Sequence, residues 1–149
     1  MPIIMEKFMA ERATILLAED DDNDVFLMRA ALKKAAVAAE LVVARDGQEA
    51  VDYLGANGNG SSKGNGAHTL PSLLLLDLKM PRLNGFDVLA WIESRPELSH
   101  LPVVVLSSSS QESDIAKARQ LGADDYQVKP NDFHDLVSLV KGFQSRWLA

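Results

Sequence analysis

Four consecutive leucines, Leu73 to Leu76, restrict the fold of this chain more than any other feature of its sequence. The run is too short to cross a membrane, and Pro71 before it and a Pro, Asn and Gly turn after it favour a strand buried on both faces. Asp77 follows where this strand ends. Because burying an unpaired carboxylate costs several kcal/mol, Asp77 needs partners or a chemical role.

The rest of the chain alternates short apolar runs with segments whose apolar residues recur at helical spacing. The predicted strands cover residues 13–18, 41–44, 73–77, 102–106 and 126–128. Helices are predicted after the acidic cluster 19–24, from Asp46, after Gly85, from Ser109 and from Asn131 or Asp132. Two pairs have the spacing of a capping box, Asp46 with Glu49 and Ser109 with Glu112. This alternation predicts one α/β domain with a doubly wound parallel sheet covered by helices on both faces.

The composition suits a single domain of 149 residues and limits its partners. A formal net charge of −6 argues against nucleic acid or an anionic membrane as the partner. The absence of cysteine excludes disulfides and thiolate metal sites, and we expect a soluble cytoplasmic protein. Residues 1–12 are expected to form an N-terminal extension without a signal peptide, and residues 55–69, rich in Gly, Asn and Ser, a flexible insert loop.

Polar residues follow the predicted strands at the edge where such sheets bind their ligands, beyond the carboxyl ends of the strands. They are Glu19, Asp20, Asp77, Ser107 and Lys129. Three converging carboxylates repel one another unless a cation lies between them, and oxygen ligands without a nearby cysteine or histidine suit Mg²⁺. With a lysine and a hydroxyl nearby, the edge is suited to phosphoryl transfer with Asp77 as the nucleophile.

Four local patterns occur together in this chain. They are Glu19-Asp20, Asp77-x-x-Met80-Pro81-x-x-Asn84-Gly85, Ser107 after the fourth strand, and Tyr126-x-x-Lys129-Pro130. Together they resemble the receiver domain of two-component response regulators, and the resemblance covers residues 13–149 as one receiver domain. It implies a flavodoxin-like (βα)5 fold with strand order 2-1-3-4-5. It also implies a phosphoacceptor signalling protein, whose only chemistry is its own phosphorylation and slow autodephosphorylation, rather than an enzyme.

The resemblance implies a role for each residue around the acceptor. Asp77 would be the phosphoacceptor that attacks the phosphohistidine of a sensor histidine kinase. Asp20 would bind Mg²⁺ directly and Glu19 would reach the ion through water. The backbone carbonyl of Lys79 would complete the protein ligands.

The resemblance also implies how the phosphoryl group is held and reported. Ser107 would close on the phosphoryl group, Lys129 would contact it, and Tyr126 would be the aromatic switch. The bond between Lys129 and Pro130 is expected to be cis, so that Pro130 shapes the loop that directs the lysine. The fourth predicted helix, the fifth strand and the last helix would form a face for output or homodimerisation.

The chain is also similar to regulators that work with bacteriophytochrome-type kinases, in Asp24-Val25 after the acidic pair, in residues 101–109 and in the ending at Trp147. No output domain is expected beyond Ala149. Lys79 departs from the common pattern by placing a cation two residues beyond the acceptor. The 55–69 loop leads to the amino end of the third strand, opposite the site, so shortening it is predicted to leave phosphorylation intact.

Three other functions share parts of this pattern. A flavodoxin-like FMN carrier has the same fold, but the acidic residues Glu19 and Asp20 would repel the FMN phosphate. An aspartyl-phosphate phosphatase also uses a strand-end Asp, yet typically has a second Asp as general acid where this chain has Lys79. A receiver-shaped binding module that is regulated without phosphorylation stays open, and equal partner affinity with and without a phosphate mimic at Asp77 would support it.

Overall fold

The computed structural model describes residues 13–58 and 70–148. The strands in these ranges are β1 (Ala13–Ala18), β2 (Ala39–Ala44), β3 (Leu73–Leu76), β4 (Val103–Ser107) and β5 (Asp125–Val128). The helices are α2 (Asp22–Lys34), α3 (Gly47–Gly58), α4 (Gly85–Glu93), the short 3₁₀ helix η1 (Pro96–Leu98), α5 (Glu112–Gln120) and α6 (Phe133–Arg146). None of them combines the length and apolar character that a transmembrane span requires.

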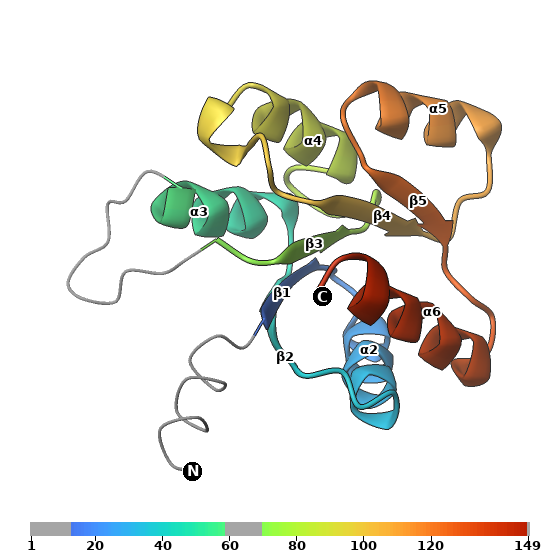
Figure 1. Ribbon diagram of the computed structural model, residues 1–149. Helices are drawn as coiled ribbons and strands as arrows, with labels where there is room; N and C mark the ends of the chain where they lie inside the picture. The colour runs from blue at the N-terminus through green and yellow to red at the C-terminus, as the bar shows by residue number, and fades with distance from the viewer. Residues whose placement is uncertain (1–12, 59–69, 149) are drawn as a thin grey trace, which may run out of the picture.

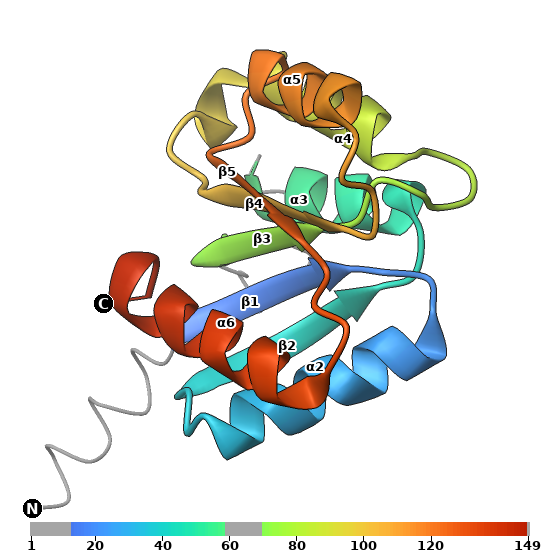
Figure 2. The same ribbon diagram turned by 90° about the vertical axis from the view of Figure 1, so that its right-hand side faces the viewer.

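The five strands form one parallel sheet in the order β2-β1-β3-β4-β5. Helices α3, α4 and α5 lie on one face of this sheet, and α2 and α6 lie on the other (Figures 1 and 2). The predicted doubly wound, flavodoxin-like fold with strand order 2-1-3-4-5 is therefore confirmed. All strand ends that carry the predicted site residues lie at one edge of the sheet.

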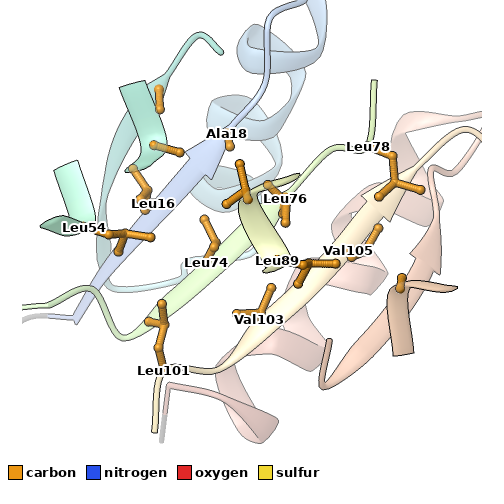
Figure 3. Packing of buried hydrophobic residues seen from close by; sticks show 14 of the residues in the cluster. Leu16, Ala18, Leu54, Leu74, Leu76, Leu78, Leu89, Leu101, Val103 and Val105 are labelled. Atoms are coloured by element: carbon orange, nitrogen blue, oxygen red, sulfur yellow. The ribbon is translucent and has the colours of Figure 1, made fainter. Parts of the chain in front are cut away.

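The leucines of β3 point alternately into two hydrophobic layers. Leu74 and Leu76 belong to the layer under α3, α4 and α5, shown in Figure 3. Leu73 and Leu75 belong to the layer that β3 shares with α2 and α6. All four side chains are completely buried. The run of leucines is unbroken because this strand has no solvent-facing side.

The predicted strand positions agree with the structure apart from small shifts at the ends. β2 begins at Ala39 rather than at residue 41, and β4 extends through Ser107. β3 ends at Leu76, so Asp77 is the first residue beyond it. Helix α3 continues to Gly58, past the predicted start of the flexible loop at Gly55. The remainder of that loop and the predicted extension 1–12 lie outside the described residues.

Side chains cap the helices that begin at the site edge. Asp21 caps α2 by accepting hydrogen bonds from the backbone N–H groups of Asn23 and Asp24, at 2.8 and 3.0 Å. Asn84 and Asp87 form a reciprocal capping box at the start of α4. Each cap fixes the direction in which the chain leaves the sheet edge.

The two predicted capping boxes have different outcomes. Asp46 accepts from the Glu49 N–H at 2.8 Å, while the Glu49 carboxylate accepts from the N–H of Arg45 instead of that of Asp46. The box at Ser109 and Glu112 is wrong, because α5 begins at Glu112 with Gln111 as its N-cap and without a side-chain cap. The Ser109 hydroxyl instead donates to the carboxylate of Asp114, in the first turn of α5.

Candidate functional site

Asp77 is held in place by backbone contacts at the end of β3. Its N–H donates to the carbonyl of Ala18 at 3.1 Å, and its Oδ1 accepts from the N–H of Leu78 at 2.8 Å. Gly85 packs directly behind it, since a Cβ there would lie 2.4 Å from the Asp77 carbonyl oxygen. The side chain is 6% exposed. Asp77 is therefore a buried, immobilised carboxylate whose Oδ2 faces Lys129.

The ammonium of Lys129 contacts three carboxylates. Its Nζ lies 2.8 Å from Oε1 of Glu19, 2.7 Å from Oδ2 of Asp24 and 3.4 Å from Oδ2 of Asp77. The Lys129 backbone N–H donates to the carbonyl of Ser107 at 2.7 Å, which keeps the lysine beside the end of β4. Residues that follow β1, β3 and β5 thus meet in one ion-paired cluster, as the sequence predicted for Glu19, Asp77 and Lys129.

Burial controls the electrostatics of this cluster. It raises the pKa of Glu19 to about 7, against the hydrogen bond from Lys129, and the charge of Asp77 adds to the rise. Burial also raises the pKa of Asp77, although Lys129 and the Leu78 N–H favour the charged form. Burial disfavours the charge on Lys129, but the hydrogen bonds to Asp24 and Glu19 outweigh it and raise the pKa of the ammonium. The buried carboxyls therefore favour additional positive charge at the site.

The carboxylates also form a candidate metal site. Oxygens of Glu19, Asp20 and Asp77 lie within 4.8 Å of one another. Glu19 and Asp77 are buried, whereas Asp20 is exposed. An all-oxygen donor set with an open, solvent-facing side suits Mg²⁺, which keeps several waters and accepts phosphate oxygens. The residues present therefore fit the predicted cation.

A cleft of about 470 Å³ gives access to this edge of the sheet. Its lining includes Asp20, Lys79, Ser107, Ser109 and Asp114. Asp20 belongs to both the cleft and the carboxylate cluster, so a phosphodonor in the cleft would lie beside the candidate metal site. Ser107, which ends β4, and Lys79, two residues after Asp77, line the same cleft.

A chain of hydrogen bonds connects Ser107 with Tyr126. The Oγ of Ser107, which is 1% exposed, accepts from the N–H of Ser109 at 3.1 Å. The Tyr126 hydroxyl donates to the carbonyl of Ser109 at 2.8 Å, and the tyrosine ring is buried. Tyr126 therefore contacts the segment after β4 through Ser109 and does not line the cleft directly.

The prediction of a cis bond at Pro130 is wrong. No peptide bond within residues 13–58 and 70–148 is cis, so the bond between Lys129 and Pro130 is trans. The trans form of such a bond is favoured by about 0.5–1 kcal/mol. The ammonium of Lys129 reaches its three carboxylates with the bond in this form.

Asp24 makes a contact with Lys129 that the sequence does not predict, because an acidic residue at the start of a helix is also typical of a cap. Its carboxylate lies 2.7 Å from the Lys129 ammonium. The sequence does contain one signal. Asp24 precedes the apolar residues Met28 and Leu32 by four and eight positions, so it lies on the stripe of α2 that these two residues bury. An acidic residue on such a stripe needs a buried partner.

Comparisons with known proteins agree with this geometry. The family model for the response regulator receiver domain matches residues 15–141. The response regulator Rcp1 of Synechocystis sp. is 37% identical over 134 residues, which cover 90% of this chain and 88% of Rcp1.

Two solved structures extend the comparison. The phosphorylated cyanobacterial phytochrome response regulator RcpA has a TM-score of 0.80 and 38% identity, covering 93% of this chain and 95% of RcpA. The Mn²⁺-bound form of Rcp1 has a TM-score of 0.77 and 35% identity, covering 91% of this chain and 94% of that structure. With its fold, its strand-end constellation and these matches, the chain belongs to the response regulator receiver domain family.

Proposed function

We propose that this protein is a phosphorylation-dependent switch in which Asp77 accepts a phosphoryl group from the phosphohistidine of a sensor histidine kinase. The observation that carries the proposal is the convergence of Glu19, Asp77 and Lys129 at the carboxyl ends of β1, β3 and β5. Phosphoryl transfer depends mainly on positioning and charge neutralisation. A fixed, buried carboxylate with an ammonium at 3.4 Å supplies both.

Glu19, Asp20 and Asp77 are the side chains proposed to hold Mg²⁺, with the backbone carbonyl of Lys79 as a further ligand. The mutual approach of the three carboxylates supports this assignment. The Mn²⁺-bound form of the related Rcp1 supports a divalent cation in a protein of this kind. When bound, Mg²⁺ would neutralise the carboxylates and the incoming phosphoryl oxygens.

In the transfer, an Oδ of Asp77 attacks phosphorus. A P–O bond forms while the P–N bond of the phosphohistidine breaks, and the electron pair stays on the imidazole nitrogen, which takes a proton from water. Lys129 would hold the phosphoryl oxygens by charge, and Ser107 would donate its hydroxyl to them. The product is an acyl phosphate, which water hydrolyses slowly, so that the protein resets itself without a separate enzyme.

The phosphorylated state would reach partners through Tyr126. Ser107 and Tyr126 are both hydrogen-bonded to Ser109. A shift of Ser107 toward a phosphoryl group would therefore move Ser109 and alter its hydrogen bond with the tyrosine hydroxyl. Tyr126 lies on β5, between α5 and α6. The face made by α5, β5 and α6 is therefore the proposed output face, and the same face is the proposed site of homodimerisation.

The proposed partner is a sensor kinase of the phytochrome type. This follows the relatives, since RcpA carries the name of a phytochrome response regulator and aligns over 93% of this chain. The net charge of −6 supports a protein partner rather than nucleic acid or an anionic membrane. The proposed compartment is the cytoplasm, where a receiver meets its kinase.

A second candidate is a binding module that acts without phosphorylation. One observation favours it: Tyr126 is buried and its hydroxyl donates to the Ser109 carbonyl, so the segment after β4 is held by contacts within the protein itself. Measuring partner affinity for the wild type with and without a phosphate mimic at Asp77 separates the two functions. Equal affinities would support the module and contradict the switch.

The experiment that tests the proposed function is phosphorylation by a small phosphodonor, with and without Mg²⁺. Intact-mass spectrometry would count the phosphoryl groups, and peptide mapping would locate them. We expect one group on Asp77, dependent on Mg²⁺ and absent from Asp77→Asn. Asp52→Asn is the matched control, because Asp52 lies on α3 and hydrogen-bonds to Gln48. Equal labelling of wild type and Asp77→Asn would exclude Asp77 as the acceptor.

A further inference from the structure

The shortest contact of the Lys129 ammonium is with a residue outside the predicted site. Its Nζ lies 2.7 Å from Oδ2 of Asp24, compared with 3.4 Å from Oδ2 of Asp77. A charged hydrogen bond has full strength near the shorter distance and is weak at the longer one. Lys129 is therefore bound mainly by Asp24 and by Glu19, at 2.8 Å, rather than by Asp77.

Asp24 is held rigidly in this position. It is in the first turn of α2, where its N–H is bound by the N-cap Asp21, and the helix packs against α6 through its buried face. Asp24 and Lys129 share the lining of a small cavity of about 50 Å³ with apolar side chains, among them Met28 and Leu136. The side chain of Asp24 is 35% exposed and that of Lys129 is 20% exposed. Their contact is thus partly shielded from water.

Asp24 differs from the other two partners of Lys129 in its relation to the cation site. Glu19 and Asp77 belong to the carboxylate cluster that fits Mg²⁺, whereas Asp24 is not part of that cluster among the described residues. A bound divalent cation would compete with the lysine for Glu19 and Asp77 and would repel it. Asp24 is the carboxylate that stays available to Lys129 under those conditions.

We propose that Asp24 is a positioning residue, which keeps the Lys129 ammonium at the site when a cation and a phosphoryl group take the oxygens of Glu19 and Asp77. The expected effect on phosphorylation rests on the proposed function, whereas the contact between Asp24 and Lys129 does not depend on it. Without the Asp24 carboxylate, the long lysine side chain would move into solvent and contact the phosphoryl group for a smaller fraction of the time.

The first test is made on the metal-free protein and needs no phosphorylation. The ¹H–¹⁵N signal of the Lys129 ammonium is observed by NMR, under conditions where exposed lysines lose their signals to exchange with water. We expect the signal in the wild type and in Asp22→Asn, and its loss in Asp24→Asn. Asp22 is the matched control, because it lies in the same helical turn, is 85% exposed and pairs with Arg45. Loss in both variants, in neither, or absence of the signal from the wild type would overturn the proposal.

The second test measures the rate of phosphorylation by phosphoramidate at saturating Mg²⁺. Asp24→Asn should react about tenfold more slowly than wild type, because the lysine is displaced, while Asp22→Asn should change little. Asp24→Glu, which keeps a carboxylate, should recover part of the rate. In a Lys129→Gln background, Asp24→Asn should change the rate by less than about twofold, because it then has no lysine to position.

A role of Asp24 in folding alone, or as a metal ligand, would slow the reaction equally in both backgrounds, and this outcome would overturn the proposal. A wild-type protein that takes up no phosphoryl group at Asp77 would instead refute the proposed function. In that case the NMR comparison still decides whether Asp24 positions Lys129.

Discussion

The hydroxyl of Tyr126 donates a hydrogen bond to the carbonyl of Ser109 over 2.8 Å and thereby joins β5 to the segment that follows β4. Ser109 is itself bound on two sides, by the Oγ of Ser107 at 3.1 Å and by the carboxylate of Asp114 at 2.6 Å. Ser109 therefore lies between the hydroxyl at the site and the first turn of α5. The hydrogen bond from Tyr126 connects this segment with β5.

Replacing Tyr126 with Phe would remove this hydrogen bond and keep the buried ring. We expect the free energy of unfolding to fall by about 1 kcal/mol, as measured by urea denaturation. Amide exchange should become faster at Ser109 and Gln111, whose N–H groups are bonded within the same segment. Phosphorylation of Asp77 should persist. Unchanged exchange at both amides would show that Tyr126 does not hold the segment.

Replacing Gly85 with Ala would disturb the backbone next to Asp77. The new Cβ would lie 2.4 Å from the Asp77 carbonyl oxygen and 2.8 Å from the Leu78 Cα, so the backbone must shift. We expect a loss of about 2 kcal/mol or more in urea denaturation. Gly142→Ala is the matched control, because nothing lies within 4 Å of its added Cβ in α6. It should gain about 0.5–1 kcal/mol, and a similar loss in both variants would contradict the assigned role of Gly85.

Asp46 should make the stability depend on pH in the acid range. Its hydrogen bond from the Glu49 N–H, followed by that from Arg82, holds the pKa of the carboxyl below its usual value. A lowered folded-state pKa means that the stabilisation is complete above the unfolded pKa and is lost as pH falls through the folded pKa. Asp46→Asn should therefore melt a few degrees lower than wild type at pH 7.

The difference in melting temperature should shrink once the pH falls below about 4, where the unfolded carboxyl takes up its proton. Asp52→Asn, which removes a carboxylate from α3 that is hydrogen-bonded to Gln48, serves as the control for the loss of one acidic side chain. A constant difference between wild type and Asp46→Asn from pH 7 to pH 3 would contradict the assignment.

Replacing Asp20 with Asn should weaken binding of Mg²⁺ at least about tenfold in isothermal titration calorimetry, because a carboxylate is lost from the three-acid cluster. The fold should be retained, since the Asp20 side chain is exposed. Asp22→Asn, which removes the same charge from a side chain paired with Arg45, should change the affinity much less. Equal weakening in the two variants would indicate a general effect of charge rather than a ligand.

The sequence was sufficient for the fold and for the meeting point of the site residues. In a chain whose strands alternate with helices, an unbroken apolar run such as Leu73 to Leu76 is predicted to form a strand buried on both faces. Once the sheet is parallel, the residues after its strands share an edge. The meeting of Glu19, Asp77 and Lys129 follows from this topology and needs no knowledge of side-chain detail.

What could not be predicted depends on competition between nearby polar groups. Ser109 has the spacing of a cap, but its hydroxyl donates to Asp114 and its carbonyl accepts from Tyr126, which is distant in sequence. Asp24 has the composition of a cap residue, yet it binds Lys129. Local propensity ranks the options for each side chain, whereas tertiary contacts select among them.

The alternation of the β3 leucines between two layers has a consequence for how the protein opens. β3 is the middle strand of the sheet, and each helical layer packs on its own pair of leucines. Fraying of either layer leaves the strand anchored by the other, so the amides of Leu73 to Leu76 should exchange only when the whole domain unfolds. If Asp77 accepts a phosphoryl group as proposed, local opening of the helices would leave the strand that carries the modified residue in place.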